Sequence, residues 1–302
     1  FDQVYETLTV TKDDGTVAPC LAKSWKMSDD CLEYTFQLEE GVKFHNGEVM
    51  TADDVVYSFE QYLANPAKNN FVSMIDKVEM VDANTVKVTL NKITPLFLVY
   101  INELPILNKK FVEEHNGNIS DVACGTGPYK LTSIDLATSA MLERNDDYRL
   151  APAAIEKVEL RYVGDRSTAS VQLETGDLDI MSIDPSQLVS FENNDKFTVE
   201  KVQTLKTALL AINTTVAPLD NKLVRQAMTY AVDKKSVITI AYENCAVPAR
   251  LQASDTNCFG VDFSDATDFS YNPEKAKELL AEAGYPNGLN FADYGIQMDV
   301  LG

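Results

Sequence analysis

Apolar and polar residues alternate strictly between Leu32 and Glu39. The apolar positions of this run are Leu32, Tyr34, Phe36 and Leu38. A period of two predicts a strand with one buried face. A second alternating run at residues 85–90 follows a strand-like stretch at 77–81 and a turn at 82–84. These two runs predict a β-hairpin.

Helix-start signals recur along the chain. Thr51 follows a loop that contains Gly41 and Gly47, and Asp54 stands three residues further on, which predicts a capping box. The apolar face of that helix comprises Val55, Phe59, Tyr62 and Leu63. Further helices are expected after Asn108, from Asp220 to Ala231, after Asp233, and from Asn272–Pro273 to Gly284.

The pattern from residue 129 onward adds more strands. Residues 129–134 and 140–144 are expected to be strands, and Val158, Leu160 and Tyr162 alternate as another. A helix then runs to Thr175 and ends at Gly176, before a short apolar stretch at residues 177–180. Strand, helix and strand of this length predict a βαβ unit with parallel pairing. One more apolar strand is expected at residues 207–213.

Charge restricts the partners. The chain has 302 residues, 26 of them basic and 46 acidic, for a formal net charge of -20. Such a surface argues against nucleic acid and against docking on anionic lipid, because both need positive charge. No stretch approaches the roughly 20 apolar residues of a membrane helix. No signal peptide is present, so we expect a cytoplasmic chain, a mature chain or a shortened one.

The five cysteines and two histidines offer little metal chemistry. No CxxC pair is present, which argues against a structural zinc site. Cys245 and Cys258 flank a loop, so a bridge between them and ordinary thiols are both open. His45 and His115 are isolated in loops, where nickel or heme recognition and a plain surface histidine are both open.

Six stretches in the same order resemble the family 5 extracellular solute-binding proteins, the oligopeptide, dipeptide and nickel receptors of ABC importers. They are QVYE-L at residues 3–8, the strand, loop and capped helix at 21–60, GTGPY at 125–129, ETGDLD at 174–179, VRQA with AVDK at 224–234, and YNPEKAKELLAEAGYP at 271–286. The matches extend over nearly the whole chain. The resemblance therefore implies a receptor and not an enzyme.

The resemblance also implies the architecture. We expect an α/β, periplasmic-binding-protein-like fold of class II, type C, with a mixed-sheet lobe and an additional α+β subdomain. The expected parts are residues 1–38 and 151–246 for lobe I, 39–150 for the extra subdomain, and 247–302 for the hinge and the start of lobe II. The hinge is expected around Cys245 and Pro248. Family members run to about five hundred residues, so the chain is expected to be incomplete at both ends, with most of lobe II missing.

By the same resemblance, Tyr5, Glu6, Leu8 and Asn213 are the candidate ligand-binding residues. Glu6 as an exposed surface acid and Asn213 as a turn residue before Pro218 remain open alternatives. The implied partners are a short peptide and the membrane permease subunits of an ABC transporter, with no cofactor, and a monomer is expected. The implied location is extracellular or periplasmic, with a lipid anchor on a cysteine upstream of Phe1. Nickel or metal chelate, heme and oligosaccharide are the alternative solutes.

An enzyme is the competing class, and its usual signatures are missing. There is no G-x-S-x-G elbow and no H-E-x-x-H pair, which disfavours a hydrolase. A Cys124–His115 pair is imaginable, but a buried thiol is favoured for Cys124. Gly125-Thr126-Gly127 lacks the Gly-Lys-Ser/Thr of a phosphate loop, so these glycines are expected to allow unusual backbone angles instead. The acids between Glu174 and Asp179 are expected to be a solvated helix end.

Overall fold

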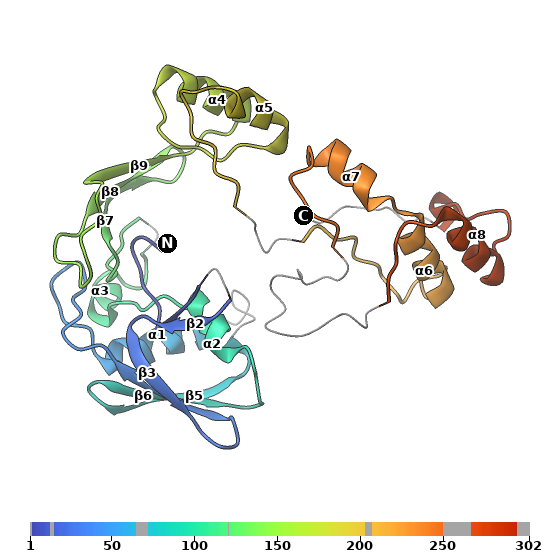
Figure 1. The fold of residues 1–302 in the computed structure, drawn as a ribbon. Helices are drawn as coiled ribbons and strands as arrows, with labels where there is room; N and C mark the ends of the chain where they lie inside the picture. The colour runs from blue at the N-terminus through green and yellow to red at the C-terminus, as the bar shows by residue number, and fades with distance from the viewer. Residues whose placement is uncertain are drawn as a thin grey trace. The chain divides into compact units, whose positions relative to one another are not determined.

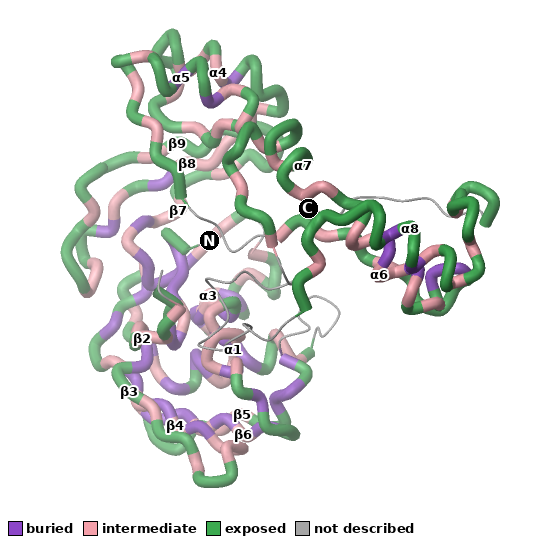
Figure 2. The backbone as a smooth tube through the Cα atoms, turned by 45° about the vertical axis from the view of Figure 1, so that its right-hand side comes forward, coloured by how far each residue is buried: buried purple, intermediate pink, exposed green. Residues whose placement is uncertain are grey.

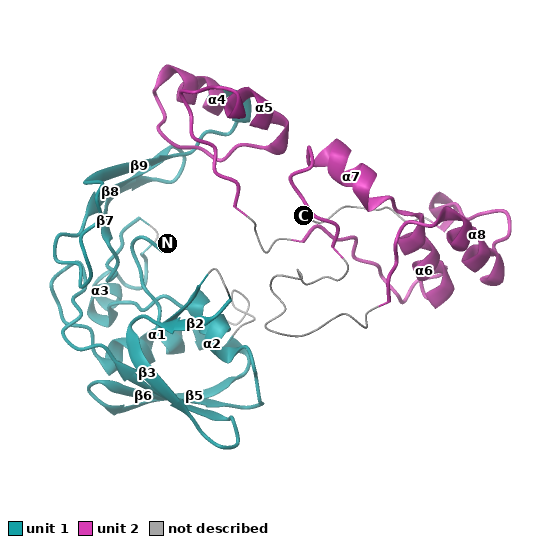
Figure 3. Ribbon diagram, viewed as in Figure 1, with its two compact units in different colours: residues 1–168 teal, residues 169–302 magenta. Residues whose placement is uncertain are grey.

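The computed structural model describes residues 2–12, 15–64, 72–119, 121–202, 207–249 and 267–294. The chain divides into two compact units, residues 1–168 and 169–302 (Figures 1 and 3). Within the described ranges, no helix is long and apolar enough to cross a bilayer.

Unit 1 is built on a four-stranded antiparallel sheet of order β3-β4-β6-β5. Its strands are β3 (Ala22–Met27), β4 (Glu33–Leu38), β5 (Ile75–Asp82) and β6 (Thr85–Leu90). The alternation predicted for β4 is confirmed, because Tyr34, Phe36 and Leu38 are 4%, 0% and 1% exposed and the positions between them are half-buried. Figure 2 colours the backbone by burial, and buried positions recur along the strands of this sheet. The sheet takes strands from both sides of the boundary predicted at residue 38, and the division into lobes stays a prediction.

Helix α1 (Ala52–Ala64) packs against β5 and β6 through the predicted face, with Val55 and Phe59 fully buried. The remaining helices of the unit are α2 (Phe97–Tyr100), followed by a 3₁₀ turn at Ile101–Glu103, and α3 (Lys109–Glu114). The sheet and these helices enclose one core of aliphatic and aromatic side chains. A two-stranded sheet of β1 (Thr9–Thr11) and β2 (Val17–Pro19) lies beside it.

A second sheet has the order β7-β8-β9, with β7 (Tyr129–Asp135), β8 (Ser139–Arg144) and β9 (Lys157–Arg161). Its small core contains Val4, Tyr5, Tyr129 and Leu142. Val4 and Tyr5, near the start of the given sequence, therefore contribute to the core of a sheet that begins more than a hundred residues later in the chain.

Unit 2 is mainly helical. Helix α4 (Arg166–Thr175) begins at the unit boundary and ends at Gly176, which has a φ of +83°. The others are α5 (Leu188–Glu192), preceded by a 3₁₀ turn at Pro185–Gln187, α6 (Lys222–Ala231), α7 (Lys234–Ala241), α8 (Pro273–Glu282) and a 3₁₀ turn at Phe291–Tyr294. Helices α6 and α8 pack together through Ala227, Ala276 and Leu279.

Four predictions about the elements are wrong: two strands, the parallel βαβ unit and one helix cap. Residues 177–180 are not a strand, residues 207–213 contain only an isolated β-bridge at Leu209, and β9 pairs antiparallel with β8, so there is no parallel βαβ unit in the described chain. An apolar run becomes a strand only where another strand takes up its backbone hydrogen bonds, and Ile180 is instead 83% exposed. The cap of α6 is Asn221 and not Asp220, because its side chain accepts from the N–H of Leu223 at 2.9 Å.

Candidate functional site

The segment at residues 3–8 lies against the loop at residues 125–129. The N–H of Gly127 donates to the carbonyl of Val4 at 3.0 Å, and that of Tyr129 donates to Gln3 at 2.9 Å. Further along the segment, the N–H of Ile106 donates to the carbonyl of Glu6 at 2.9 Å. The candidate residues of this segment are therefore held by backbone bonds to distant parts of unit 1.

The two glycines of this loop are explained by close backbone approach. A Cβ on Gly125 would lie 2.0 Å from the carbonyl oxygen of Val4, and one on Gly127 would lie 2.7 Å from that of Gln3. Neither glycine adopts the left-handed conformation. The expectation that they supply unusual backbone angles is wrong, because what they supply is room for another backbone.

The side chains of the segment separate into apolar anchors and one acid. Leu8 is 1% exposed and belongs to the main core, while Tyr5 is 7% exposed and packs in the smaller core of β7 and β8. Glu6 lies between these two anchors and is 8% exposed, so the alternative of an exposed surface acid is wrong. The segment bridges two cores and places a carboxylate between them.

Glu6 is the centre of a buried polar cluster. Its Oε1 accepts from Arg149 Nη2 at 2.8 Å, from Tyr148 Oη at 3.0 Å and from Cys20 Sγ at 3.6 Å. Its Oε2 and the Nε of Arg149 have no hydrogen-bond partner in the described part of the chain. The ion pair thus uses one oxygen and one terminal nitrogen, and it ties the N-terminal segment to the turn after β8.

The buried carboxylate keeps its donors protonated. Burial and the nearby charge of Glu6 raise the pKa of the Cys20 thiol to about 11. The same two causes raise the pKa of the Tyr148 hydroxyl to about 12. Both groups therefore donate hydrogen bonds to Glu6 near neutral pH, and Cys20 is a poor nucleophile there.

His45 contacts the same loop from the other side. Its backbone N–H donates to the carbonyl of Gly125 at 2.9 Å, and its Nδ1 accepts from the N–H of Gly125 at 3.3 Å. Its Nε2 lies 3.0 Å from the carbonyl oxygen of Gly127. The half-buried ring is therefore part of the site scaffold, and the plain surface-histidine alternative is wrong for His45.

His115 and the cysteines add no candidate chemistry. His115 stacks on Phe111, with ring centroids 4.1 Å apart, and its Nδ1 lies 2.7 Å from the Phe111 carbonyl oxygen. Cys124 is the buried thiol that the sequence favoured, and Cys245 is a free, exposed thiol, while Cys258 lies outside the described residues. The described ranges contain no group of three or more His, Cys, Asp or Glu side chains suited to a metal ion.

Asn213, the fourth candidate, belongs to unit 2. Its Oδ1 accepts from the N–H of Thr215 at 3.0 Å and from the Thr215 hydroxyl at 2.7 Å. The residue is exposed and closes a turn, as the turn alternative expected. Its role toward a ligand stays a prediction.

Unit 2 also contains a pocket with a volume of about 760 Å³. Its lining includes Asp233, Lys234, Asp268, Phe269 and Tyr271. Three of these charges already have partners: Asp233 caps α7, Lys234 Nζ donates to Ala249 O at 2.8 Å, and Asp268 accepts from Ser270. Lys235 lines the pocket as well, together with the aromatic rings of Phe269 and Tyr271.

Solved structures that are similar to this chain include binding proteins with different bound solutes. NikZ from Campylobacter jejuni, in complex with Ni(L-His), superposes with a TM-score of 0.80 at 30% identity, covering 93% of this chain and 58% of that one. DppA from Helicobacter pylori, an ABC transporter-associated periplasmic binding protein in complex with the peptide STSA, gives 0.79 at 29% identity, covering 95% and 61%. Residues 16–295 match the family described as bacterial extracellular solute-binding proteins, family 5 middle, and the chain belongs to that family.

The names of the curated relatives give different cargoes. Heme-binding protein A of Haemophilus influenzae is 33% identical over 98% of this chain and 59% of its own length. The nickel-binding periplasmic protein of Escherichia coli is 31% identical over 93% and 56%. The chain thus spans less than two thirds of the relatives that it matches. The family and the periplasmic-binding-protein fold are as the sequence predicted.

Proposed function

We propose that this chain is part of the substrate-binding component of an ABC importer that captures short peptides. The observation that carries the proposal is the family match, which extends over residues 16–295. Peptide cargo is supported by three solved neighbours described with a peptide bound: STSA, a nonapeptide and Met-Leu. A binding protein of this class performs no chemistry on its solute, which agrees with the missing hydrolase motifs.

The proposed ligand-binding residues are Tyr5, Glu6, Leu8 and Asn213. The side chains of Tyr5 and Leu8 are buried in cores, so we assign them the task of fixing the segment on which Glu6 stands. Glu6 has one carboxylate oxygen without a partner in the described residues, and a carboxylate suits a peptide ammonium. The amide of Asn213 suits a peptide backbone, which has both donors and acceptors.

Heme is the second candidate cargo. The observation that favours it is the 33% identity to heme-binding protein A over nearly the whole of this chain. Relatives described as glutathione-binding and nickel-binding have 32% and 31% identity, so identity alone does not separate the cargoes.

The proposal includes the partners and the place of action. The solute-loaded protein delivers its cargo to the permease subunits of the importer, outside the cytoplasmic membrane. It acts as a monomer, anchored by lipid on a cysteine ahead of Phe1. Metabolic labelling of the whole gene product with a palmitate analogue tests the anchor.

Calorimetry on the whole gene product tests the cargo. Di- to octapeptides, glutathione, hemin and Ni(L-His) are titrated in parallel, and we expect saturable binding of peptides. Binding of hemin or the nickel complex alone overturns the peptide assignment. A Glu6→Gln variant is expected to weaken peptide binding at least several-fold, because a neutral amide no longer attracts the peptide ammonium.

A further inference from the structure

The hydrogen bonds around His45 demand one protonation state. The N–H of Gly125 is a donor, so Nδ1 must offer a lone pair. The carbonyl of Gly127 is an acceptor, so Nε2 must carry the proton. Only a neutral imidazole protonated on Nε2 satisfies both partners.

These partners are the residues that hold the N-terminal segment. Gly127 uses its N–H on Val4, and its carbonyl also accepts from Asn145 Nδ2 at 3.1 Å. Gly125 is the glycine whose added Cβ would overlap the carbonyl of Val4. A shift of this loop is therefore transmitted directly to the backbone of the segment that leads to Glu6.

We infer that His45 is a positioning residue that clamps residues 125–127 onto the N-terminal segment, and that protonation of its ring loosens this clamp at Gly125. In the imidazolium form Nδ1 becomes a donor, faces the N–H of Gly125 and loses that bond. The inference rests on the proposed function only in linking the clamp to solute binding. The clamp itself depends on geometry inside unit 1.

The electrostatic surroundings favour the neutral ring. Burial lowers the pKa of His45 below its ordinary value of 6.5, and Lys130 on β7 adds to the effect, whereas the hydrogen bond to Gly127 and the charge of Glu6 oppose it. Cys124, which also faces this turn, is a thiol whose pKa is raised by burial, so it stays uncharged near neutrality. Glu48 on the same loop forms an ion pair with Lys110.

The sign of the pH effect follows from linkage. The unfolded chain binds the proton more readily than the folded one, so folded stability falls as pH drops below about 6.5. One proton changes the unfolding equilibrium constant by at most about tenfold for each pH unit. The loss of folded stability ends below the pKa of His45 in the folded chain, because the ring is then protonated in both the folded and the unfolded chain.

The test compares wild type with His45→Gln, whose neutral amide offers an acceptor and a donor at every pH. Unfolding in urea is measured between pH 7.5 and 5.5, with His115→Gln as the matched control. Between pH 7.5 and 5.5, we expect the unfolding equilibrium constant of wild type to rise several-fold more than that of His45→Gln. The rise for His115→Gln should equal that of wild type. An equal pH dependence of wild type and His45→Gln overturns the inference.

Two local measurements remain informative if His45→Gln folds poorly. Imidazole ¹⁵N shifts of wild type report the tautomer directly, and a proton on Nδ1 of His45 near neutral pH contradicts the clamp. Amide exchange of Gly125, corrected for its intrinsic rate, should accelerate several-fold in wild type on acidification; unchanged protection contradicts release. Since neither measurement needs a solute, failure of the clamp is distinguishable from failure of the proposed cargo.

Discussion

At the scale of single residues, Glu6 and its partner show what a sequence leaves out. The motif around Glu6 marks the segment, but Arg149 stands 143 residues away and belongs to no pattern that names it as a partner. Its role depends on the turn after β8, which is a product of the fold. His45 is similar: its sequence position in a loop suggests exposure, and only the approach of the loop at residues 125–127 gives it two partners.

Arg149→Met is expected to destabilise the protein by about 2–3 kcal/mol. The change leaves a buried carboxylate uncompensated, a cost reduced here because the Arg149 side chain is 21% exposed. Urea unfolding measures the loss. Arg161→Met removes an exposed pair with Glu159 and should cost under about 1 kcal/mol. Equal losses of stability in the two variants would show that the buried ion pair stabilises the protein no more than the exposed one.

Gly125→Ala is expected to cost more than about 3 kcal/mol, beyond the usual range of overpacking, because its Cβ would meet backbone at 2.0 Å. Gly164→Ala is the control, since the nearest atom to its Cβ lies at 3.7 Å. The control should change stability by less than about 0.5 kcal/mol in the same unfolding experiment. A tolerated Gly125→Ala would contradict the close approach of the two backbones.

At the scale of elements, helices and hairpins were predictable where their signals are local. Helix α8 is capped by Asn272, whose side chain accepts from the N–H of Lys275 at 3.0 Å, as the sequence pattern indicated. The β5–β6 hairpin is confirmed for the same reason. The strand predicted at residues 177–180 failed because a strand needs a partner that lies elsewhere in the chain, and hydrophobicity alone does not supply one. At residues 207–213 the pairing is limited to a single bridge at Leu209.

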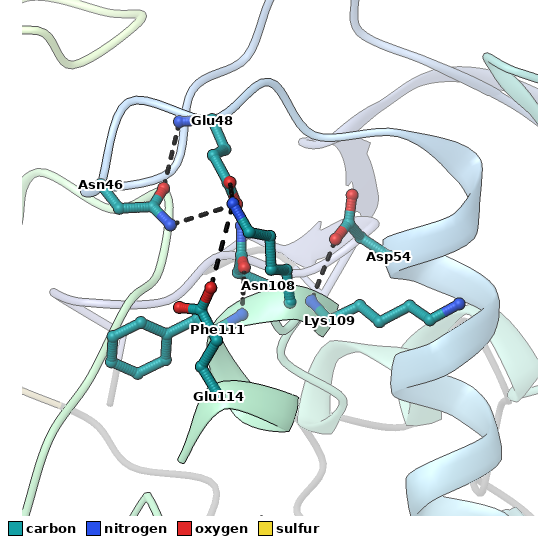
Figure 4. Close-up of polar contacts among 8 residues, drawn as sticks. Asn46, Glu48, Asp54, Asn108, Lys109, Phe111 and Glu114 are labelled. Carbon is teal, nitrogen blue, oxygen red and sulfur yellow. Dashed lines mark hydrogen bonds and ion pairs between the residues drawn. The ribbon is translucent and has the colours of Figure 1, made fainter. Parts of the chain in front are cut away.

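One acid joins two helices in a way that the capping pattern did not indicate. Asp54 Oδ2 accepts from the N–H and hydroxyl of Thr51, while its Oδ1 accepts from the N–H of Lys109 at 3.0 Å. Figure 4 shows this side chain of α1 directed at the start of α3, beside the contacts of Asn108 with Glu48 and with the N–H of Phe111. Asp54 therefore serves the first turns of both helices.

Asp54→Ala should accordingly cost about 2 kcal/mol or more, above the typical value of about 1 kcal/mol for one helix cap. Its neighbour Asp53 is the matched control, because it makes an exposed ion pair with Lys109 Nζ at 2.8 Å. Asp53→Ala should cost at most about 1 kcal/mol by thermal or urea unfolding. The bridge would be disproved by equal costs at the two positions.

At the scale of the whole molecule, the two units differ in the size of their hydrophobic cores. The main core of unit 1, which its four-stranded sheet and helices enclose, contains more than twenty buried apolar residues. The described part of unit 2 has one small cluster of Ala227, Ala276 and Leu279, and its other buried apolar residues are Ala169, Leu188, Phe191, Leu219 and Val224. Its Ile180, Val189 and Ile240 are 83%, 65% and 79% exposed. Stability of a unit rises with the apolar area that it buries, so the two should respond differently to isolation.

Residues 1–168 produced alone are expected to keep nearly all of their β-sheet circular dichroism signal without denaturant. They are expected to lose it in one cooperative transition in urea. Residues 169–302 alone should lack a cooperative transition, because their described core is small. Cooperative unfolding of the second fragment, or its absence in the first, would contradict this assignment of stability.

The N-terminal segment has a consequence for the order in which the chain matures. It is synthesised before its partners: its carbonyls accept from the N–H groups of Ile106, Gly127 and Tyr129, and its Glu6 carboxylate accepts from Arg149. Contacts between residues so far apart form only after the intervening chain exists, and closing such long loops is slow. Residues 3–8 can therefore take up these contacts only after the chain through Arg149 has been synthesised.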